Sequence, residues 1–243
     1  MSDPFAGRVV VVSPHLDDGV LSLGAAISRA TAAGIAEVVV LTVCGGDVTS
    51  EQTASGWDVL GGFATEGEAT RARRTEDAAA CRLVGAAPVW LPFRDGAYTR
   101  DRDDEATARA VAEATANADA AFIPGFPLLH HDHVWLAQLL LRARLPCRSM
   151  WLYAEQPYTH RSRGIPPAPP DSVRSALSFW PAWSRVRVGI RDRARKQKAI
   201  RTYRSQLRGL RFGGVGHARL IAMLAHEAVH GGEAIARVES ERR

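Results

Sequence analysis

Two kinds of apolar run alternate along this chain of 243 residues. Short runs rich in valine and other β-branched residues predict strands, and the four consecutive valines at 9–12 are typical of a strand buried on both faces. Longer stretches carry apolar residues three to four positions apart and predict helices. We expect strands at 7–13, 36–44, 87–93, 119–125 and 147–155, and helices at 19–34, 65–85, 105–118 and 134–144.

The alternation of strands and helices predicts an α/β fold: a three-layer sandwich with a mostly parallel sheet and helices on both faces. The helix at 65–85 has clear end signals, with Thr65 as N-cap, Glu68 completing a capping box and Gly85 ending it. Residues 45–64 are expected to form a long loop.

The regular alternation stops near residue 156. A proline-rich loop at 163–172, a basic helix at 191–207 and a C-terminal helix at 217–230 are expected after it. No internal repeat or linker is evident, so we predict one domain over 1–243, with about 156–243 packing around the mouth of the sheet.

Composition fits an ordinary globular protein, with 46% hydrophobic and 23% charged residues. The three cysteines show no CxxC spacing and are read as buried thiols in a reducing compartment. No export signal is visible, and no apolar run is long enough to span a membrane. These features predict a cytoplasmic protein without a membrane partner.

The charge is uneven, because residues 185–211 contain eleven Lys or Arg and a single acid, Asp192, in a chain of net charge +5. Such a run is typical of a solvated helix face, or of a surface for an acidic substrate or nucleic acid. No nucleic-acid motif accompanies it, so we favour the solvated face and predict no nucleic-acid partner.

Two clusters of polar residues follow expected strands. His15, Asp17 and Asp18 come after the first strand, and a second cluster follows the fourth: His130, His131, Asp132 and His133. In open parallel sheets ligands bind beyond the carboxyl ends of the strands, and strands one and four commonly neighbour each other. The two clusters are therefore expected to face each other.

Histidine nitrogens and carboxylate oxygens are common zinc ligands, and zinc with an open position lowers the pKa of a bound water to about 7. One aspartate could bind the metal while the other accepts a proton from the water. Taken singly, these residues have simpler explanations. His15 could bond the backbone, Asp17 and Asp18 could cap the next helix, and the other histidines could be exposed loop residues.

The segments "SPHLDDGVLSLG" and "HHDHVWLA" together resemble the LmbE-like, or PIG-L, deacetylases, whose motifs are AHPDDE and HPDH. The resemblance implies a Rossmann-like fold and zinc-dependent removal of an acetyl group from N-acetylglucosamine-type sugars. It implies one zinc ion per chain on His15, Asp18 and His133. It also implies that Asp17 is the general base, and that His130 stabilises the oxyanion or helps to protonate the leaving amine.

Two weaker similarities concern the substrate. "RRTEDAAACRLVG" is similar to a family helix that places Arg73 near the substrate, and "LPFRDG" is similar to a loop that places Asp95 on the sugar. The chain departs from the family motifs at Leu16 and Gly19, neither of which is a metal-ligand position in the family, and at Leu128, where some members carry an active-site tyrosine. We further expect Asp132 to orient one of the ligating imidazoles.

Two other functions stay open at this point. "HEAVH" at 226–230 matches the metalloprotease motif H-E-x-x-H, although Gly231 and Gly232 end the expected helix at once. A third ligand would have to come from a probable tail or from elsewhere in the fold. The second alternative is a catalytically silent module that binds a sugar or nucleotide. Against nucleotide binding, no G-x-G-x-x-G motif follows the first strand.

The expected partner is a small N-acetylated sugar or glycoside. Its carrier could be an antibiotic scaffold, a thiol-cofactor precursor or a phosphoinositide glycan. The sequence leaves a homo-oligomer open.

Overall fold

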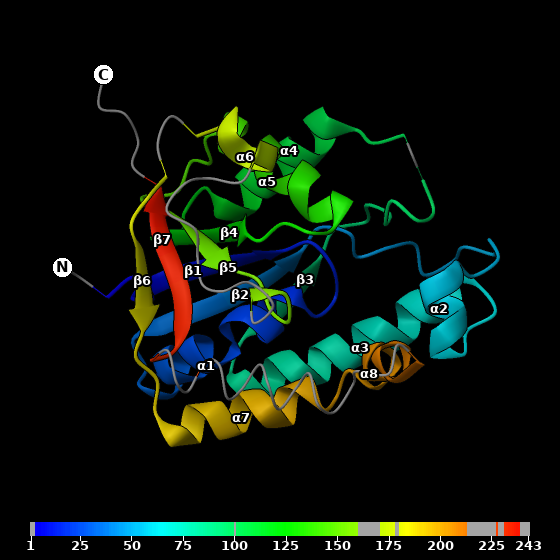
Figure 1. Cartoon of the computed structure of the whole chain (residues 1–243), viewed down its shortest axis with the longest axis horizontal. Helices are drawn as coiled ribbons and strands as arrows, with labels where there is room; N and C mark the ends of the chain where they lie inside the picture. The colour runs from blue at the N-terminus through cyan, green and yellow to red at the C-terminus, as the bar shows by residue number, and fades with distance from the viewer. Residues whose placement is uncertain are drawn as a thin grey trace.

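A single mixed sheet organises the molecule, with strand order β3-β2-β1-β4-β5-β7-β6 (Figure 1). The computed structural model describes residues 3–99, 101–159, 171–177, 180–212, 227 and 231–238. The strands are β1 (Gly7–Ser13), β2 (Ala36–Thr42), β3 (Ala87–Trp90), β4 (Ala120–Phe126), β5 (Met150–Ala154), β6 (Trp183–Val186) and β7 (Glu233–Val238). Strands β1 to β5 pair in parallel, whereas β7 pairs antiparallel with both β5 and β6.

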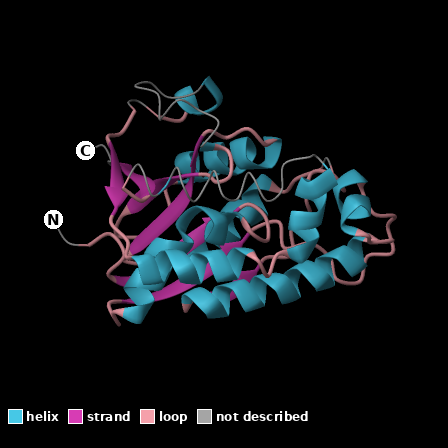
Figure 2. Cartoon of the chain, turned by 60° about the horizontal axis from the view of Figure 1, so that its bottom comes forward, coloured by secondary structure: helices cyan, strands magenta, loops and turns pink. Residues whose placement is uncertain are grey.

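Helices cover both faces of the sheet, as Figure 1 shows, and the view in Figure 2 brings one helical layer forward. The helices are α1 (Asp18–Ala32), α2 (Gly56–Gly61), α3 (Glu66–Val84), α4 (Asp104–Thr115), α5 (His131–Ala143), α6 (Asp171–Arg174), α7 (Ile190–Ile200) and α8 (Arg204–Phe212). The first face carries α1, α3 and α7, and the second carries α4 and α5. The predicted α/β three-layer class is confirmed.

The valine run explains why β1 lies at the centre. Val9 and Val11 pack into the core under α1 and α3, while Val10 and Val12 pack into the core under α5. Successive side chains of a strand point to opposite faces, so a continuous apolar run suits a strand that is covered on both sides.

Strands β1 and β4 are neighbours, with Val9 opposite Ala120 and Val11 opposite Phe122. This pairing was expected from the strand order of open α/β sheets. It brings the segments that follow the two strands to the same edge of the sheet.

Several predicted boundaries are wrong. The expected loop at 45–64 contains α2, and α5 begins at His131 instead of after the second histidine cluster. The expected basic helix is two helices, because residues 201–203 interrupt it. Thr202 Oγ1 donates to the carbonyl of Glu76 and Tyr203 Oη donates to Asp77 Oδ1, which anchors this break to α3.

The last third of the chain contributes strands to the sheet. The sequence analysis treated residues after 232 as a probable tail, whereas Glu233–Val238 forms β7 between β5 and β6. Most of the proline-rich loop and of the helix expected at 217–230 lies outside the described residues. The boundaries of the single domain stay a prediction.

The capping box of α3 differs in one detail. Thr65 accepts a hydrogen bond from Glu68 N, as expected, but the Glu68 carboxylate accepts from Ala64 N instead of the N-cap residue. Among the described helices, none is both long and apolar enough to cross a bilayer.

Candidate active site

The turn after β1 leaves the Asp17 carboxylate free for chemistry. Ser13 Oγ accepts a hydrogen bond from Gly19 N at 2.9 Å, so Ser13 satisfies a donor at the start of α1. Asp17 occupies the N-cap position but its side chain makes no capping hydrogen bond. Asp18 Oδ2 instead accepts from the backbone N–H of His15 at 3.0 Å, which folds the turn back toward the imidazole. Helix capping, the simpler explanation offered for Asp17 in the sequence analysis, therefore does not account for this aspartate.

The second histidine cluster forms the first turn of α5. His130 is the N-cap, and its Nδ1 accepts from the backbone N–H of Asp132 at 3.3 Å. His133 and Asp132 are buried, whereas the His131 side chain is 63% exposed. From the sequence, this cluster was expected to lie in a loop before a helix that starts at residue 134, which is wrong. The helix starts earlier because the imidazole of His130 caps it and the Asp132 carboxylate suits its positive end.

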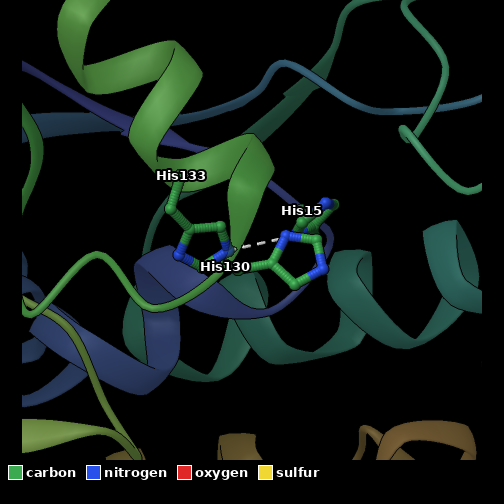
Figure 3. A group of neighbouring side chains, drawn as sticks. All are labelled: His15, His130 and His133. Atoms are coloured by element: carbon green, nitrogen blue, oxygen red, sulfur yellow. Dashed lines mark hydrogen bonds between the residues drawn. The ribbon is translucent and has the colours of Figure 1, made fainter. Parts of the chain in front are cut away.

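Three donor atoms from the two clusters meet at one point. His15 Nδ1 lies 3.2 Å from His133 Nε2, and Asp18 Oδ2 lies 3.3 Å and 3.2 Å from these two nitrogens. Figure 3 shows the imidazoles of His15, His130 and His133 together at the start of α5. The structure thus brings together all three residues predicted to hold a metal.

A carboxylate lies behind each of the two converging imidazoles. His15 Nε2 donates to Asp132 Oδ2 at 2.9 Å, and His133 Nδ1 donates to Glu155 Oε1 at 2.5 Å. Hydrogen bonds of this kind fix the ring orientation of metal-binding histidines and leave the other nitrogen free to bind. Asp132 therefore has the orienting contact that was expected of it.

These donors fit a divalent cation. Zinc bonds of about 2.0–2.1 Å in a tetrahedron imply ligand atoms about 3.3–3.4 Å apart, close to the observed 3.2–3.3 Å. Because both outer nitrogens donate to carboxylates, the two inner nitrogens face each other and need a positive charge between them, either a proton or a metal ion. The His130 imidazole also offers a nitrogen within 4.8 Å of those of His15 and His133.

The charges around the imidazoles point the same way. Although burial opposes the charged form, the carboxylates of Asp132, Asp18 and Asp95 raise the pKa of His15 to about 10. Burial likewise opposes a charged His133, but Asp18 and Glu155 raise its pKa well above the usual value. The cluster therefore favours positive charge at this point, which a bound cation supplies.

Asp17 and Asp18 have opposite electrostatic environments. Burial and the neighbouring Asp18 charge raise the pKa of Asp17 to about 7, although His15 and Arg73 oppose the shift. The pKa of Asp18 is lowered despite its burial, because His133 and His15 stabilise the carboxylate. Adjacent carboxylates with such different environments suit a proton acceptor beside a charged ligand.

The residues expected to contact substrate lie close by. Arg73 on α3 forms an ion pair with Asp58 of α2, which in turn accepts a hydrogen bond from Tyr98. Asp95 Oδ2 lies 3.4 Å from His15 Nε2. The roles of Arg73 and Asp95 toward a substrate stay predictions.

His130 is suited to remain uncharged. Burial and the nearby His15 and His133 lower its pKa to about 4. Because its Nδ1 accepts from the backbone, the neutral ring carries its proton on Nε2. His130 can therefore donate a hydrogen bond without a net charge.

Sequence reasoning missed Glu155, which follows β5. Its carboxylate accepts from both His133 Nδ1 and Leu128 N. The segment after β5 therefore contributes to the site together with the segments after β1 and β4. The single available signal was an acidic residue at the carboxyl end of a strand that neighbours β4.

The alternative metalloprotease motif contains a described residue, Glu227, whose carboxylate is buried and accepts from Lys196 Nζ at 2.7 Å. A glutamate engaged in a buried ion pair does not suit water activation. The motif's histidines, His226 and His230, lie outside the described residues.

The basic stretch is mostly a solvated surface. The exposed basic residues are Arg187, Arg191, Arg195, Lys198, Arg201, Arg204 and Arg208. Lys196 differs from them because it is fully buried between Glu227 and Glu233.

Comparisons with known proteins agree with this geometry. The family model described as PIG-L: GlcNAc-PI de-N-acetylase matches residues 10–144, more than half of the chain. No curated protein gives a significant match.

Solved structures resemble the chain over nearly its full length. A triple mutant of the deacetylase Orf2 of the teicoplanin biosynthetic pathway is 25% identical, with 97% of this chain and 100% of that chain covered and a TM-score of 0.81. The A40926 pseudoaglycone deacetylase Dbv21 is 27% identical, with 98% and 100% covered and a TM-score of 0.80. The N,N'-diacetylchitobiose deacetylase of Pyrococcus horikoshii, 19% identical with 95% and 82% covered and a TM-score of 0.60, shares the fold. By its family model and the structures it resembles, the chain belongs to the PIG-L family and is a deacetylase.

Proposed function

We propose that this protein is a zinc-dependent hydrolase that removes an N-acetyl group from an aminosugar borne by a small molecule. One zinc ion per chain would be held by His15, Asp18 and His133. The observation that carries the proposal is the triangle of donor atoms 3.2–3.3 Å apart, drawn from two chain-distant segments.

The metal supplies Lewis-acid chemistry when bound, because zinc polarises a carbonyl and lowers the pKa of water. Asp17 is the residue that would take the proton from the attacking water. Its free carboxylate and its pKa of about 7 suit a group that accepts a proton and later returns it to the leaving amine.

His130 would act on the oxygen of the acetyl carbonyl. Its neutral ring can donate from Nε2, and a donor aimed at a developing oxyanion stabilises the transition state more than the substrate. Protonation of the amine by His130 is the second way in which this ring could assist.

Arg73 and Asp95 would contact the sugar. Arg73 is held by Asp58, so its guanidinium is oriented before substrate arrives. Asp95 is 27% exposed beside His15, where its carboxylate can accept hydrogen bonds from sugar hydroxyls.

The substrate class follows from the similar structures. Of the two deacetylases with the highest similarity described above, one acts in the teicoplanin biosynthetic pathway and the other is a deacetylase of the pseudoaglycone of the antimicrobial A40926. We therefore place an N-acylated aminosugar on a natural-product scaffold first, and a free N-acetylglucosamine derivative second. The three cysteines are free, in keeping with the predicted cytoplasmic compartment.

The test is a deacetylation screen. Purified protein with one equivalent of zinc is incubated with N-acetylglucosamine glycosides and with natural products that carry an N-acetylated aminosugar, and release of acetate and free amine is measured by mass spectrometry. We expect amine release from one of these classes and a loss of at least about 10²–10⁴-fold in Asp17→Asn.

Two further results decide the proposal. Metal analysis should find one zinc per wild-type chain and none in His15→Ala. Full activity in Asp17→Asn, or a wild-type protein that binds no divalent metal, would overturn the proposal.

A further inference from the structure

Asp132 is the most heavily bonded carboxylate near the site. Its side chain is fully buried, and it accepts from His15 Nε2 at 2.9 Å and from Gly96 N at 3.1 Å. His131 Nε2 lies 2.9 Å from Asp132 Oδ1, and Arg102 forms a close ion pair with that same oxygen. A buried charge of this kind needs a fixed counter-charge.

Arg102 supplies that counter-charge from a held position. Its guanidinium carbon lies 4.2 Å from the centre of the Trp135 ring, a cation–π geometry. Trp135 is itself fixed, because its Nε1 donates to Asp104 Oδ1 at 2.7 Å. The Arg102 side chain is 15% exposed, although the residue belongs to the connection that precedes α4.

The backbone approaches this contact closely at Gly96. A Cβ built on Gly96 would lie 2.3 Å from Arg102 Nη2 and 2.6 Å from Asp132 Oδ1. Glycine therefore allows the loop after β3 to close over the ion pair. The loop brings Gly96 and Arg102 to opposite sides of a single carboxylate.

We propose that Arg102 is a positioning residue that acts through Asp132 to orient His15 for metal binding. The inference rests on the proposed zinc site. Arg102 binds Oδ1 and so directs Oδ2 at His15 Nε2. The ring then keeps its proton on Nε2 and leaves Nδ1 to bind a metal ion between His15, Asp18 and His133.

The ion pair and the ring contact of Arg102 are with Asp132 and Trp135, not with the three donor atoms. Its effect should therefore appear in metal affinity and in turnover, with little effect on substrate affinity. If Arg102 only held the loop in place, Arg102→Ala would weaken zinc binding equally in the wild-type and Asp132→Asn backgrounds.

The experiment compares zinc affinity, by competition with a chelating dye, in wild type, Arg102→Ala, Arg102→Lys and Arg109→Ala. We expect Arg102→Ala to weaken zinc binding about 10–100-fold, the range seen when outer contacts of metal ligands are removed. Arg102→Lys keeps the charge and should recover part of this loss. Arg109 is an exposed arginine of α4 whose ion pair is with Glu105, so its alanine variant should bind zinc as the wild type does.

A double-mutant cycle shows whether the effect passes through Asp132. In the Asp132→Asn background, Arg102→Ala should cause less than about a threefold further loss of zinc affinity. Steady-state kinetics on the same proteins should show a lower kcat with KM nearly unchanged, and circular dichroism and thermal melts of metal-free protein check that the variants fold.

The outcomes separate this inference from the proposed function. Zinc affinity unchanged in Arg102→Ala, or a full additional loss in the Asp132→Asn background, would overturn the role of Arg102 while leaving the zinc site standing. A wild-type protein without zinc affinity would overturn both.

Discussion

Glu155 joins His133 to the backbone of the preceding loop. Its two carboxylate oxygens accept from His133 Nδ1 and from Leu128 N. Glutamine at this position has a single acceptor oxygen, so one of the two donors would face an amide NH₂ group. We expect Glu155→Gln to weaken zinc binding about 10–100-fold and to lower kcat/KM.

The measurement is zinc competition with a chelating dye, followed by kinetics at saturating zinc. Glu105→Gln is the control, because Glu105 is 90% exposed on α4 and lies away from the donor atoms. Equal zinc affinity in wild type and Glu155→Gln would show that His133 needs no carboxylate partner.

At the residue scale, the site could be predicted as far as its motifs reach. His15, Asp18 and His133 belong to two short motifs at strand ends, and the structure brings their side chains together. Glu155 and Arg102 could not be found in this way. Each contributes one side chain from a separate segment, and its contact depends on the packing of β5 or of the loop before α4.

Helix ends give the first prediction at the element scale. Gly85 ends α3 with φ +80°, and a Cβ there would lie 2.6 Å from Thr31 Oγ1. Gly34 follows α1 with φ +66°, and a Cβ there would meet nothing within 4 Å. Both positions disfavour alanine by about 1–2 kcal/mol through backbone strain.

Alanine at Gly85 must also move Thr31, so Gly85→Ala should destabilise the protein more than Gly34→Ala. The difference should be about 1–3 kcal/mol, as for other overpacked sites. Urea unfolding of the two variants measures it. Equal losses in the two would mean that Thr31 yields without cost.

The buried ion pair between α7 and Glu227 gives a prediction on pH. Lys196 Nζ donates to Glu227 and Glu233, and Glu233 also accepts from the backbone N–H groups of Ala25 and Ala26 in α1. Burial, with repulsion from Glu233, raises the pKa of Glu227 from 4.5 to about 7, although Lys196 opposes the shift.

A raised pKa means that folded protein binds more protons than unfolded protein between pH 4.5 and 7. The contribution of Glu227 to stability is thus present below pH 4.5 and is lost as pH rises to about 7. Its size is on the order of 3 kcal/mol. In Glu227→Gln, the free energy of unfolding should fall less over this pH range than in wild type. Identical pH slopes in urea unfolding would refute this.

Element boundaries were predictable where local signals decide them. The ends of β1 and α3 follow from apolar runs and capping residues. The break between α7 and α8 depends on tertiary contacts of Thr202 and Tyr203 with α3, which no local pattern contains. β7 was missed for the same reason, since its six residues become a strand by pairing with β5 and β6.

At the scale of the whole molecule, the site depends on the order of strands in the sheet. β1 and β4 are adjacent in the sheet, although two described strands and four described helices lie between them along the chain. This adjacency brings His15 Nδ1 within 3.2 Å of His133 Nε2. The alternation of elements predicted the parallel layers and this pairing. It could not predict that β6 and β7 extend the sheet beyond β5.

A site assembled from such distant segments couples metal binding to folding. Donor atoms 118 residues apart in sequence are not held together in the unfolded chain, so zinc binds the folded state preferentially. A ligand at 1,000 times its dissociation constant stabilises the folded state by about 4 kcal/mol. Removal of zinc from the wild-type protein should lower its melting temperature by several degrees, and restored zinc should recover it. His15→Ala should melt at one temperature with or without zinc, because one of the three donors is lost. Thermal melts of both proteins in chelator and in excess zinc measure this, and a zinc-dependent shift of equal size in the variant would place the metal elsewhere in the molecule.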